Sequence, residues 1–261
     1  MKIRRLVRFL AVALTALALT ATPALAEDAG WEVISTDDNF VTKRKHVEGS
    51  SIFAFRGETV VDLSIGRILN VFTDSSRRKD WVDRFYSTND LKKHGEFERT
   101  YYIRFGLPFP IADRDYVLHA KSTIDEEDRV LTAYIQSVED QNKPVDDCCV
   151  RAQAYGTYYR FEAIPGENKT KVEVEVHTNP KGMLPSWLVN MIQKNWPKKT
   201  LNGLIREASA DNQEHARFAA WHKPALPAGL VKDAADEQTA TAETEAAPAA
   251  ESTEPATTPE G

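Results

Sequence analysis

The side chains that most often carry catalysis show no recognisable arrangement in this chain. Its six histidines have no metal-ligand spacing such as H-E-x-x-H, and they are His46, His94, His119, His177, His215 and His222. The chain has neither a G-x-S-x-G nucleophile elbow nor a glycine-rich loop that could cradle phosphate. The sequence therefore predicts no catalytic residue, metal or cofactor, although a triad that assembles only on folding would leave no motif.

The two cysteines, Cys148 and Cys149, are adjacent, which is not the pattern of a disulfide framework. Adjacent cysteines can pair only with strained geometry, because ordinary disulfides require specific Cα separations. We therefore expect two small, partly buried residues at the start of a strand. A vicinal bridge or a redox role is the alternative.

Arginine and aromatic side chains offer a different chemistry, that of binding. Arg78 lies in the run Arg77-Arg78-Lys79, and a guanidinium presents a planar fork of donors that matches phosphate oxygens. From the residues alone, a solvated surface cluster is the favoured interpretation of this run. Residues 106–118 and 178–190 each join a stiff, proline-containing loop to an element rich in aromatic and aliphatic residues. These two stretches look like the rim and lid of a container, which favours binding over catalysis.

Strand patterns dominate the region that must position these residues. Val172, Val174 and Val176 alternate with charged residues and a histidine, and a period of two predicts a half-buried antiparallel strand. The predicted strands are Trp31–Ser35, Val41–Val47, Ser51–Val60, Arg99–Phe105, Asp115–Thr123, Arg129–Ser137, Ala152–Ala163 and Thr170–Thr178.

Two helical zones interrupt the strands. Asp62–Phe72 has apolar residues at helical spacing with Ser64 as its cap, and Arg77–Phe85 is expected to continue as a short helix. Ser186–Ala220 predicts a long C-terminal helix, which Pro197 should kink or break. This order of elements predicts an α+β fold in which a curved antiparallel sheet wraps around the C-terminal helix and leaves an internal cavity.

The two ends of the chain are predicted to lie outside this domain. Residues 1–26 combine a basic start, an apolar stretch and an Ala-Leu-Ala site, which predicts a cleaved signal peptide; an uncleaved anchor is the alternative. Export to the periplasm is favoured over export to the exterior. Residues 225–261 are rich in Ala, Thr, Glu and Pro, which predicts a disordered acidic tail. Residues 27–224 then form one domain. The net charge of −6 argues against nucleic-acid binding and against non-specific adhesion to anionic membranes.

Several short motifs occur together: Arg78-Lys79 with Trp81, Pro108-Phe109-Pro110, Arg114-Asp115-Tyr116-Val117, Asn179-Pro180, and Pro185-Ser186-Trp187-Leu188. With these motifs, the stretch from Trp31 to Ala210 resembles START domains, the StAR-related lipid-transfer family, and especially the phosphatidylcholine transfer protein branch. The resemblance implies a helix-grip fold. It also implies one lipid molecule enclosed under a lid that the C-terminal helix and a neighbouring loop form.

The resemblance further implies a set of ligand-binding residues. An arginine would pair with the lipid phosphate, tyrosine ring faces would line the choline end of the cavity, and the start of the last helix would face the ligand. The predicted ligand-binding residues are Arg78, Trp81, Tyr102, Tyr116, Tyr155, Trp187, Leu188, Met191 and Ile192. For the aromatic and lid residues, ordinary core packing is the alternative.

Two positions depart from the patterns of the family. Val82 stands where the branch has an acidic residue that pairs with choline, and Ala120 stands where steroid-binding relatives have an arginine. The resemblance therefore leaves the headgroup open. We interpret Arg114-Asp115 as mainly structural, holding the rim by an ion pair or a hydrogen bond.

These features favour an exported lipid-binding or lipid-transfer protein that is not an enzyme. Its ligand would be one phospholipid or a similar amphiphile, and its contact with membranes would be transient. One alternative is a grip-fold enzyme acting on a hydrophobic or aromatic small molecule, which would need a cavity group such as His119 or Glu173 with a perturbed pKa. Another is a ligand-sensing adaptor whose acidic tail recruits a partner.

Overall fold

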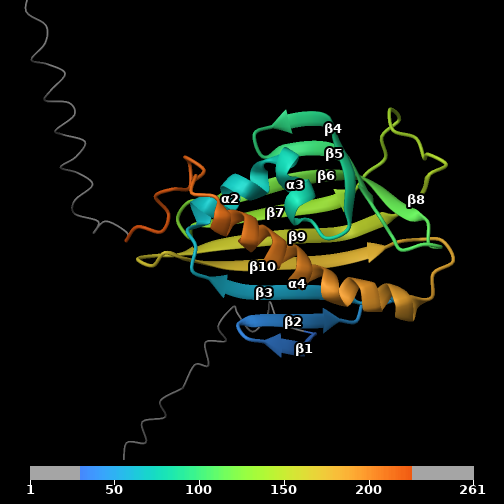
Figure 1. The fold of residues 1–261 in the computed structure, drawn as a ribbon, viewed down its shortest axis with the longest axis horizontal. Helices are drawn as coiled ribbons and strands as arrows, with labels where there is room; N and C mark the ends of the chain where they lie inside the picture. The colour runs from blue at the N-terminus through green and yellow to red at the C-terminus, as the bar shows by residue number, and fades with distance from the viewer. Residues whose placement is uncertain (1–29, 225–261) are drawn as a thin grey trace, which may run out of the picture.

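A computed structural model describes residues 30–224, and one large sheet forms the body of this region (Figure 1). The predicted signal peptide, residues 1–26, and the predicted tail, residues 225–261, lie outside the described residues. The strands are β1 (Trp31–Asp37), β2 (Phe40–Lys45), β3 (Ala54–Val61), β4 (Phe85–Gly95), β5 (Glu98–Phe105), β6 (Asp113–Asp125), β7 (Val130–Ser137), β8 (Cys149–Arg151), β9 (Gln153–Ile164) and β10 (Lys169–Asn179).

The order of the strands in the sheet is β1-β2-β3-β10-β9-β7-β6-β5-β4, and each neighbouring pair on this path is antiparallel. The short strand β8 pairs in parallel with β6. Strand β10 lies in the middle of the path, where Val172, Val174 and Val176 are all buried. The alternation that the sequence shows in this strand is thus confirmed.

Helices cover one face of the sheet (Figure 1). They are α2 (Ile65–Thr73), the 3₁₀ turn η1 (Ser75–Arg77), the single turn α3 (Arg78–Trp81) and α4 (Ser186–Ala210). Ser64 caps α2 as predicted, because its hydroxyl accepts a hydrogen bond from the amide of Arg67 at 3.4 Å. Helix α4 packs against β2, β3 and β10 and also contacts α2 and α3. This arrangement confirms the predicted α+β, helix-grip fold.

Two glycines allow α4 to approach its neighbours closely. A Cβ atom at Gly57 of β3 would lie 2.8 Å from Pro197 Cβ, and one at Gly203 of α4 would lie 2.3 Å from the Trp81 carbonyl oxygen. Both distances are too short for real contacts. The absence of a side chain at these glycines therefore sets how α4 sits on the sheet and on α3.

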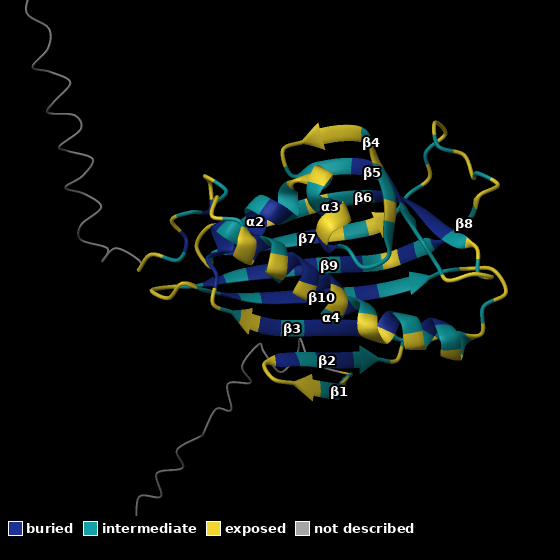
Figure 2. Cartoon of the chain, in the orientation of Figure 1, coloured by how far each residue is buried: buried dark blue, intermediate teal, exposed yellow. Residues whose placement is uncertain are grey.

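Buried side chains form a large core and a smaller second cluster. Figure 2 marks the buried residues along the elements in dark blue. The large core joins α2 and α4 to the middle of the sheet, and Leu69, Phe161 and Leu204 in it are fully buried. The second cluster lies on β5, β6 and the start of β9 and includes Tyr101 and Tyr116.

The segment after α2 differs from the prediction. The expected helix Arg77–Phe85 is only the turn α3, and Phe85 already begins β4. Strand β4 was not predicted from the sequence. It is an edge strand, its pairing with β5 is interrupted by three register shifts, and it carries Lys92 and Lys93. Lysines and bulges are common on edge strands because they discourage pairing with other chains, and they also remove the alternation that identifies a strand.

The long helix is shorter than predicted. It ends at Ala210, and Asp211 is its C-cap. The following residues turn back so that Phe218 is fully buried, and the amide of His215 donates to the carbonyl of Gly66 at 2.9 Å. The helix continues through Pro197, which is buried, so the predicted break does not occur.

The cysteine prediction is corrected in part. Cys149 begins β8, as expected of a residue at a strand start, but a disulfide joins it to Cys148. The bridge, which the sequence left as the alternative, is the form that the structure shows.

Candidate functional site

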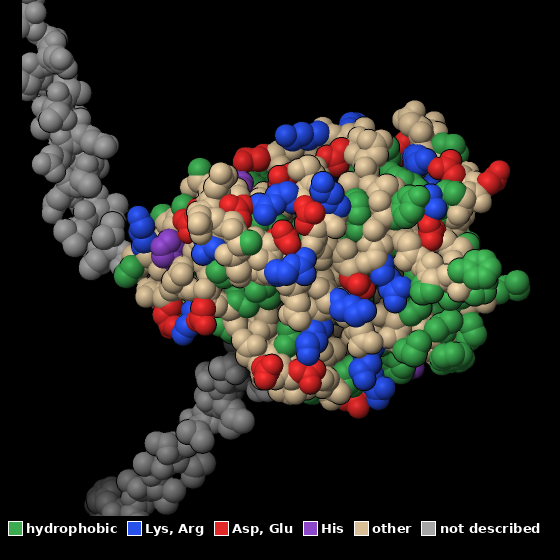
Figure 3. Space-filling view, in the orientation of Figure 1, with side chains coloured by type: hydrophobic (Ala, Val, Ile, Leu, Met, Phe, Trp, Pro, Cys, Tyr) green, Lys and Arg blue, Asp and Glu red, His purple; other side chains and the backbone are tan. Residues whose placement is uncertain are grey.

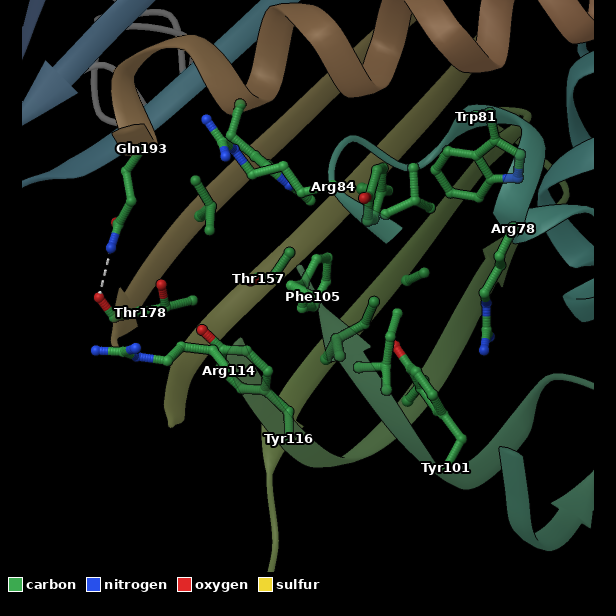
Figure 4. A pocket seen from close by; sticks show the side chains of 18 of the residues that line it. Arg78, Trp81, Arg84, Tyr101, Phe105, Arg114, Tyr116, Thr157, Thr178 and Gln193 are labelled. Carbon is green, nitrogen blue, oxygen red and sulfur yellow. Dashed lines mark hydrogen bonds between the residues drawn. The ribbon is translucent and has the colours of Figure 1, made fainter. Parts of the chain in front are cut away.

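A cavity with a volume of about 190 Å³ lies between the sheet and α4 (Figure 4). Most of its walls are aromatic and aliphatic. The lining residues come from α2 to α4, from strands β5, β6, β7, β9 and β10, and from the loops that follow β4, β5 and β10. An apolar, concave site with few polar groups is the usual form of a pocket for a small hydrophobic ligand.

Strand and helix periodicity explain which side chains reach the cavity. On β5, the alternate residues Arg99, Tyr101, Ile103 and Phe105 all line it. On α4, the spacing of three and four residues brings one face to the cavity, and this face consists of Val189, Ile192, Gln193 and Trp196.

One end of the cavity is built around Arg78, whose side chain points from α3 toward Tyr101 (Figure 4). Arg78 is 7% exposed, and its guanidinium carbon lies 4.1 Å from the centre of the Tyr101 ring. Its Nη1 donates to the hydroxyl of Thr88 at 3.3 Å. A buried guanidinium held by a ring face and one hydroxyl keeps most of its donors free for a ligand.

Arg99 lies beside Arg78 and carries a second positive charge. Its Nη1 is 4.0 Å from an Asp90 carboxylate oxygen, and its Nη2 donates to the Thr73 carbonyl at 3.4 Å. Burial and then the charge of Arg78 lower the pKa of Arg99, while Asp90 opposes this effect. The cavity end thus contains two close cations with one weakly placed carboxylate.

Three tyrosines on the cavity wall are kept neutral by burial. Burial raises the pKa of Tyr101 and of Tyr159, and it raises the pKa of Tyr116 to about 12. Trp81 packs edge-on against Tyr159 and is 6% exposed. Within residues 30–224 its indole nitrogen has no hydrogen-bond partner.

The opposite end of the cavity is closed by a network of backbone contacts. The guanidinium of Arg114 donates to the carbonyls of Ala112, Pro180 and Lys181, which joins the loop after β5 to the loop after β10. Asp115 is fully buried and forms an ion pair with Arg151 at 3.0 Å. Both residues thus hold the rim by hydrogen bonds and an ion pair, as interpreted from the sequence, and Arg114 also lines the cavity.

The structure brings together some of the predicted ligand-binding residues. Arg78, Trp81, Tyr116 and Ile192 line the cavity, as does Val82, where the family's acidic residue is missing. Whether these residues contact a ligand stays a prediction.

The other predicted residues lie outside the cavity lining. Tyr102 alternates with Tyr101 and therefore faces the opposite side of the sheet, where Lys143 Nζ lies 4.5 Å from the centre of its ring. Tyr155 falls in a register shift between β9 and β10, and its ring packs 4.9 Å from that of His177. A bulge of this kind reverses the alternation, so Tyr155 is 45% exposed.

Of the four residues predicted for the lid, Ile192 lines the cavity and the other three do not. Trp187 is 67% exposed and Met191 is 53% exposed, and neither lines the cavity; nor does the half-buried Leu188. Val189 and Gln193 take their place. The apolar pattern misled the prediction because both faces of this first half of α4 carry large hydrophobic residues.

Several lining residues were missed, namely Arg84, Arg99, Tyr101, Tyr159 and Gln193. Strand alternation could have identified Arg99 and Tyr101, because they share a face with Ile103 and Phe105. No sequence signal points to Gln193. Its side-chain amide donates a hydrogen bond to the Thr178 carbonyl at 2.8 Å (Figure 4).

The two residues named as examples for the enzyme alternative, His119 and Glu173, are not in the cavity. His119 Nε2 lies 3.1 Å from a carboxylate oxygen of Glu98, and Glu173 accepts a hydrogen bond from Tyr158 at 2.5 Å. Neither residue lines the cavity. Across residues 30–224, no three His, Cys, Asp or Glu side chains are grouped so that they could hold a metal ion.

Large hydrophobic side chains are exposed near the Arg114 end of the cavity. They are Phe109, Met183, Trp187 and Met191. The start of α4 and the loop before it lie at one end of the molecule, where hydrophobic side chains gather on the face shown in Figure 3. Within the described residues, no helix has the length and apolarity that a membrane crossing requires.

Comparison with known proteins places this architecture in a family. Phosphatidylcholine transfer protein from Bos taurus is 25% identical over 187 residues, which are 70% of this chain and 86% of that protein. An uncharacterized protein of Pseudomonas aeruginosa is 27% identical over 181 residues, which are 69% of this chain and 87% of that protein.

Solved structures share the fold. Human StAR-related lipid transfer protein 5 matches with a TM-score of 0.65 and 17% identity, over 72% of this chain and 94% of that one. A StAR-related lipid transfer protein from Xanthomonas axonopodis matches with a TM-score of 0.60 and 24% identity, over 69% and 99%. Residues 11–204 match the START domain family, and the chain therefore belongs to that family.

Proposed function

We propose that this protein binds one lipid molecule, a phospholipid or a similar amphiphile, in the cavity under α4 and transfers it between membranes. The observation that carries the proposal is an apolar cavity with the buried guanidinium of Arg78 at one end. Such a cavity suits a molecule with a long apolar part and one anionic group. Family membership and the names of the lipid-transfer relatives support the same conclusion.

The apolar walls supply most of the binding energy in this proposal. Each methylene group that moves from water into such a cavity contributes about 0.8 kcal/mol. A guanidinium then provides charge-assisted hydrogen bonds to phosphate oxygens, which fix the orientation of the headgroup. Aromatic residues such as Phe105 and Trp196 extend the apolar wall beyond the arginine end.

Transfer requires the lid to open, and the turn before α4 offers a hinge. Lys181 and Gly182 both have positive φ, at 50° and 73°, and Pro185 is the N-cap of the helix that begins at Ser186. Opening here would separate α4 from the loop that Arg114 holds. The exposed side chains of Trp187 and Met191 would meet a membrane surface first, which gives the transient membrane contact of the proposal.

The proposed subcellular location follows from the predicted signal peptide, residues 1–26. We propose an exported carrier, in the periplasm or outside the cell, that exchanges lipid between membranes. The cavity supports binding over catalysis, because His119 and Glu173 both lie outside it.

The test is to purify the protein from its host and to identify bound lipid by extraction and mass spectrometry. Labelled lipid is then followed from donor to acceptor vesicles. We expect one lipid per chain and measurable exchange; protein that is empty in every preparation and exchanges no lipid would overturn the proposal.

Two neighbouring helix residues provide a matched pair of variants. Ile192→Glu places a charge in the cavity wall and should sharply reduce the amount of retained lipid. Met191→Glu places the same charge on the exposed face and should leave retention unchanged. Equal retention by both variants would contradict the position of the ligand.

A further inference from the structure

We propose that the arginine end of the cavity selects lipids whose phosphate headgroup carries a net negative charge, and that Arg99 is the second guanidinium of this site beside Arg78. The inference rests on the proposed function and narrows it, because it names the class of headgroup. Phosphatidylglycerol and phosphatidic acid belong to the selected class, whereas zwitterionic phosphatidylcholine does not.

The first observation is the charge balance of the cavity lining. Four arginines line the cavity, Arg78, Arg84, Arg99 and Arg114, whereas Glu96 is the one carboxylate among the lining residues that the structure describes. Glu96 is exposed, at the turn between β4 and β5. Arg84 has a partner outside the lining, because its Nε lies 3.7 Å from an Asp83 carboxylate oxygen. The remaining arginines still give the cavity lining a net positive charge before any ligand enters.

The second observation concerns Arg78 and Arg99, the two arginines at the end of the cavity opposite Arg114. In the part of the chain that the structure describes, the polar contacts of Arg78 are the Thr88 hydroxyl and the Tyr101 ring, neither of which is anionic. The Asp90 carboxylate stands at the limit of ion-pair distance from Arg99, and it also accepts a hydrogen bond from Ser75. The buried guanidinium of Arg78 and the partly buried guanidinium of Arg99 thus share one distant carboxylate, and a bound anion would relieve their repulsion.

The third observation is that the Arg78 end offers no close counter-charge to a cationic headgroup. A quaternary ammonium needs a free aromatic face or a carboxylate. The Tyr101 face already holds the Arg78 guanidinium at 4.1 Å. Val82, which lines the cavity one helical turn after Arg78, is apolar. A choline group placed here would meet two arginines and no free counter-charge.

The experiment uses vesicles that contain equal amounts of phosphatidylglycerol and phosphatidylcholine with identical acyl chains. The protein is incubated with them and separated by size exclusion, and its bound lipids are quantified by mass spectrometry. A mixed vesicle presents both lipids at the same surface. The ratio of bound lipids therefore measures the headgroup preference of the cavity and not the attraction of the protein to the membrane. We expect phosphatidylglycerol to exceed phosphatidylcholine by about tenfold, as one additional charge-assisted hydrogen bond predicts.

Substitutions then show which residues cause the preference for phosphatidylglycerol. Arg99→Gln should bring the ratio to near one, whereas Lys92→Gln, which removes the same charge from an exposed site on β4, should leave it unchanged. Val82→Glu provides a second test that does not depend on the folding of the first variant. A carboxylate at this position can pair with Arg78 across one helical turn, so this variant should bind phosphatidylcholine in preference.

The outcomes separate this inference from the proposed function. Wild-type protein that takes up neither lipid refutes the carrier itself. Equal uptake of both lipids, unchanged in Arg99→Gln and in Val82→Glu, refutes the inference and leaves the carrier intact.

Free anions are tested by calorimetry with inorganic phosphate and with glycerol 3-phosphate. We expect binding at least about a hundredfold weaker than that of the lipid, because the acyl contacts are missing; tight binding of either anion without lipid uptake would mean that the site is not a lipid headgroup site.

Discussion

Replacement of Gly203 by alanine tests the packing on which the arginine end depends. Gly203 lies on the face of α4 that contacts α3, and its Cβ would lie 2.3 Å from the carbonyl oxygen of Trp81. The neighbouring carbonyl of Asp80 accepts a hydrogen bond from Arg206 at 2.7 Å, which also ties α3 to α4. No rotamer change can remove a clash with a backbone atom, so α3 must move away by about 1 Å.

The sign of the change in stability shows whether overpacking or the higher helix propensity of alanine has the larger effect. Overpacking of this kind costs about 1–3 kcal/mol, whereas alanine gains about 1 kcal/mol over glycine in a helix interior. We expect a net loss of up to about 2 kcal/mol, which lowers the melting temperature by up to about 8 °C for a domain of this size. Because α3 carries Arg78 and Trp81, uptake of anionic lipid should also fall.

Thermal unfolding followed by circular dichroism measures the first effect, and uptake from vesicles measures the second. Asn202→Ala is the control, because Asn202 is exposed on the same helix and its replacement should stabilise the protein slightly. A Gly203→Ala protein that melts at or above the wild-type temperature would refute the close approach of α3 and α4.

Two further predictions concern the tyrosines and the exposed hydrophobic end. The pKa of Tyr116 is about 12 in the folded protein and about 10 when unfolded, so its stabilising effect is present below pH 10 and is lost as the pH rises toward 12. Urea unfolding at pH 9 and pH 11 should therefore show a smaller loss of stability in Tyr116→Phe than in wild type, and an equal loss would contradict the buried, neutral state. Trp187→Ser, at a position that is 67% exposed, should slow transfer between vesicles several-fold without changing the melting temperature or the amount of bound lipid. Val33→Ser, which removes another exposed hydrophobic side chain, is the control; equal rates in both variants would exclude Trp187 from membrane contact.

The fold could be predicted where the pattern of burial is simple. The alternation in β10 and the Ser64 cap of α2 are local signals, and both occur in the structure as expected. Strand β4 gave no such signal because it is a polar edge strand with three register shifts. The end of α4 was missed because Phe218 and the alanines beside it are apolar for another reason: Phe218 returns to the core in a non-helical turn after the helix has ended.

The site could be predicted as a region but not in every residue. The motifs that carry the family resemblance identified Arg78, Trp81 and Tyr116, all of which line the cavity. Tyr102 and Tyr155 were expected to face the cavity, but neither lines it, because each faces the other side of the sheet. A shift of one residue, or one bulge, reverses that side, and a single sequence does not reveal it.

The most direct test of the account is native mass spectrometry of the protein after incubation with lipid vesicles. The account predicts a mass increase of one lipid per chain in the wild type. In Ala133→Trp a large ring fills the cavity from β7, where Ala133 is buried in the lining, and the bound lipid should be lost while the fold is retained. Wild-type protein without bound lipid, or equal amounts of lipid on the wild type and on a folded Ala133→Trp variant, would contradict the claim that this cavity holds the ligand.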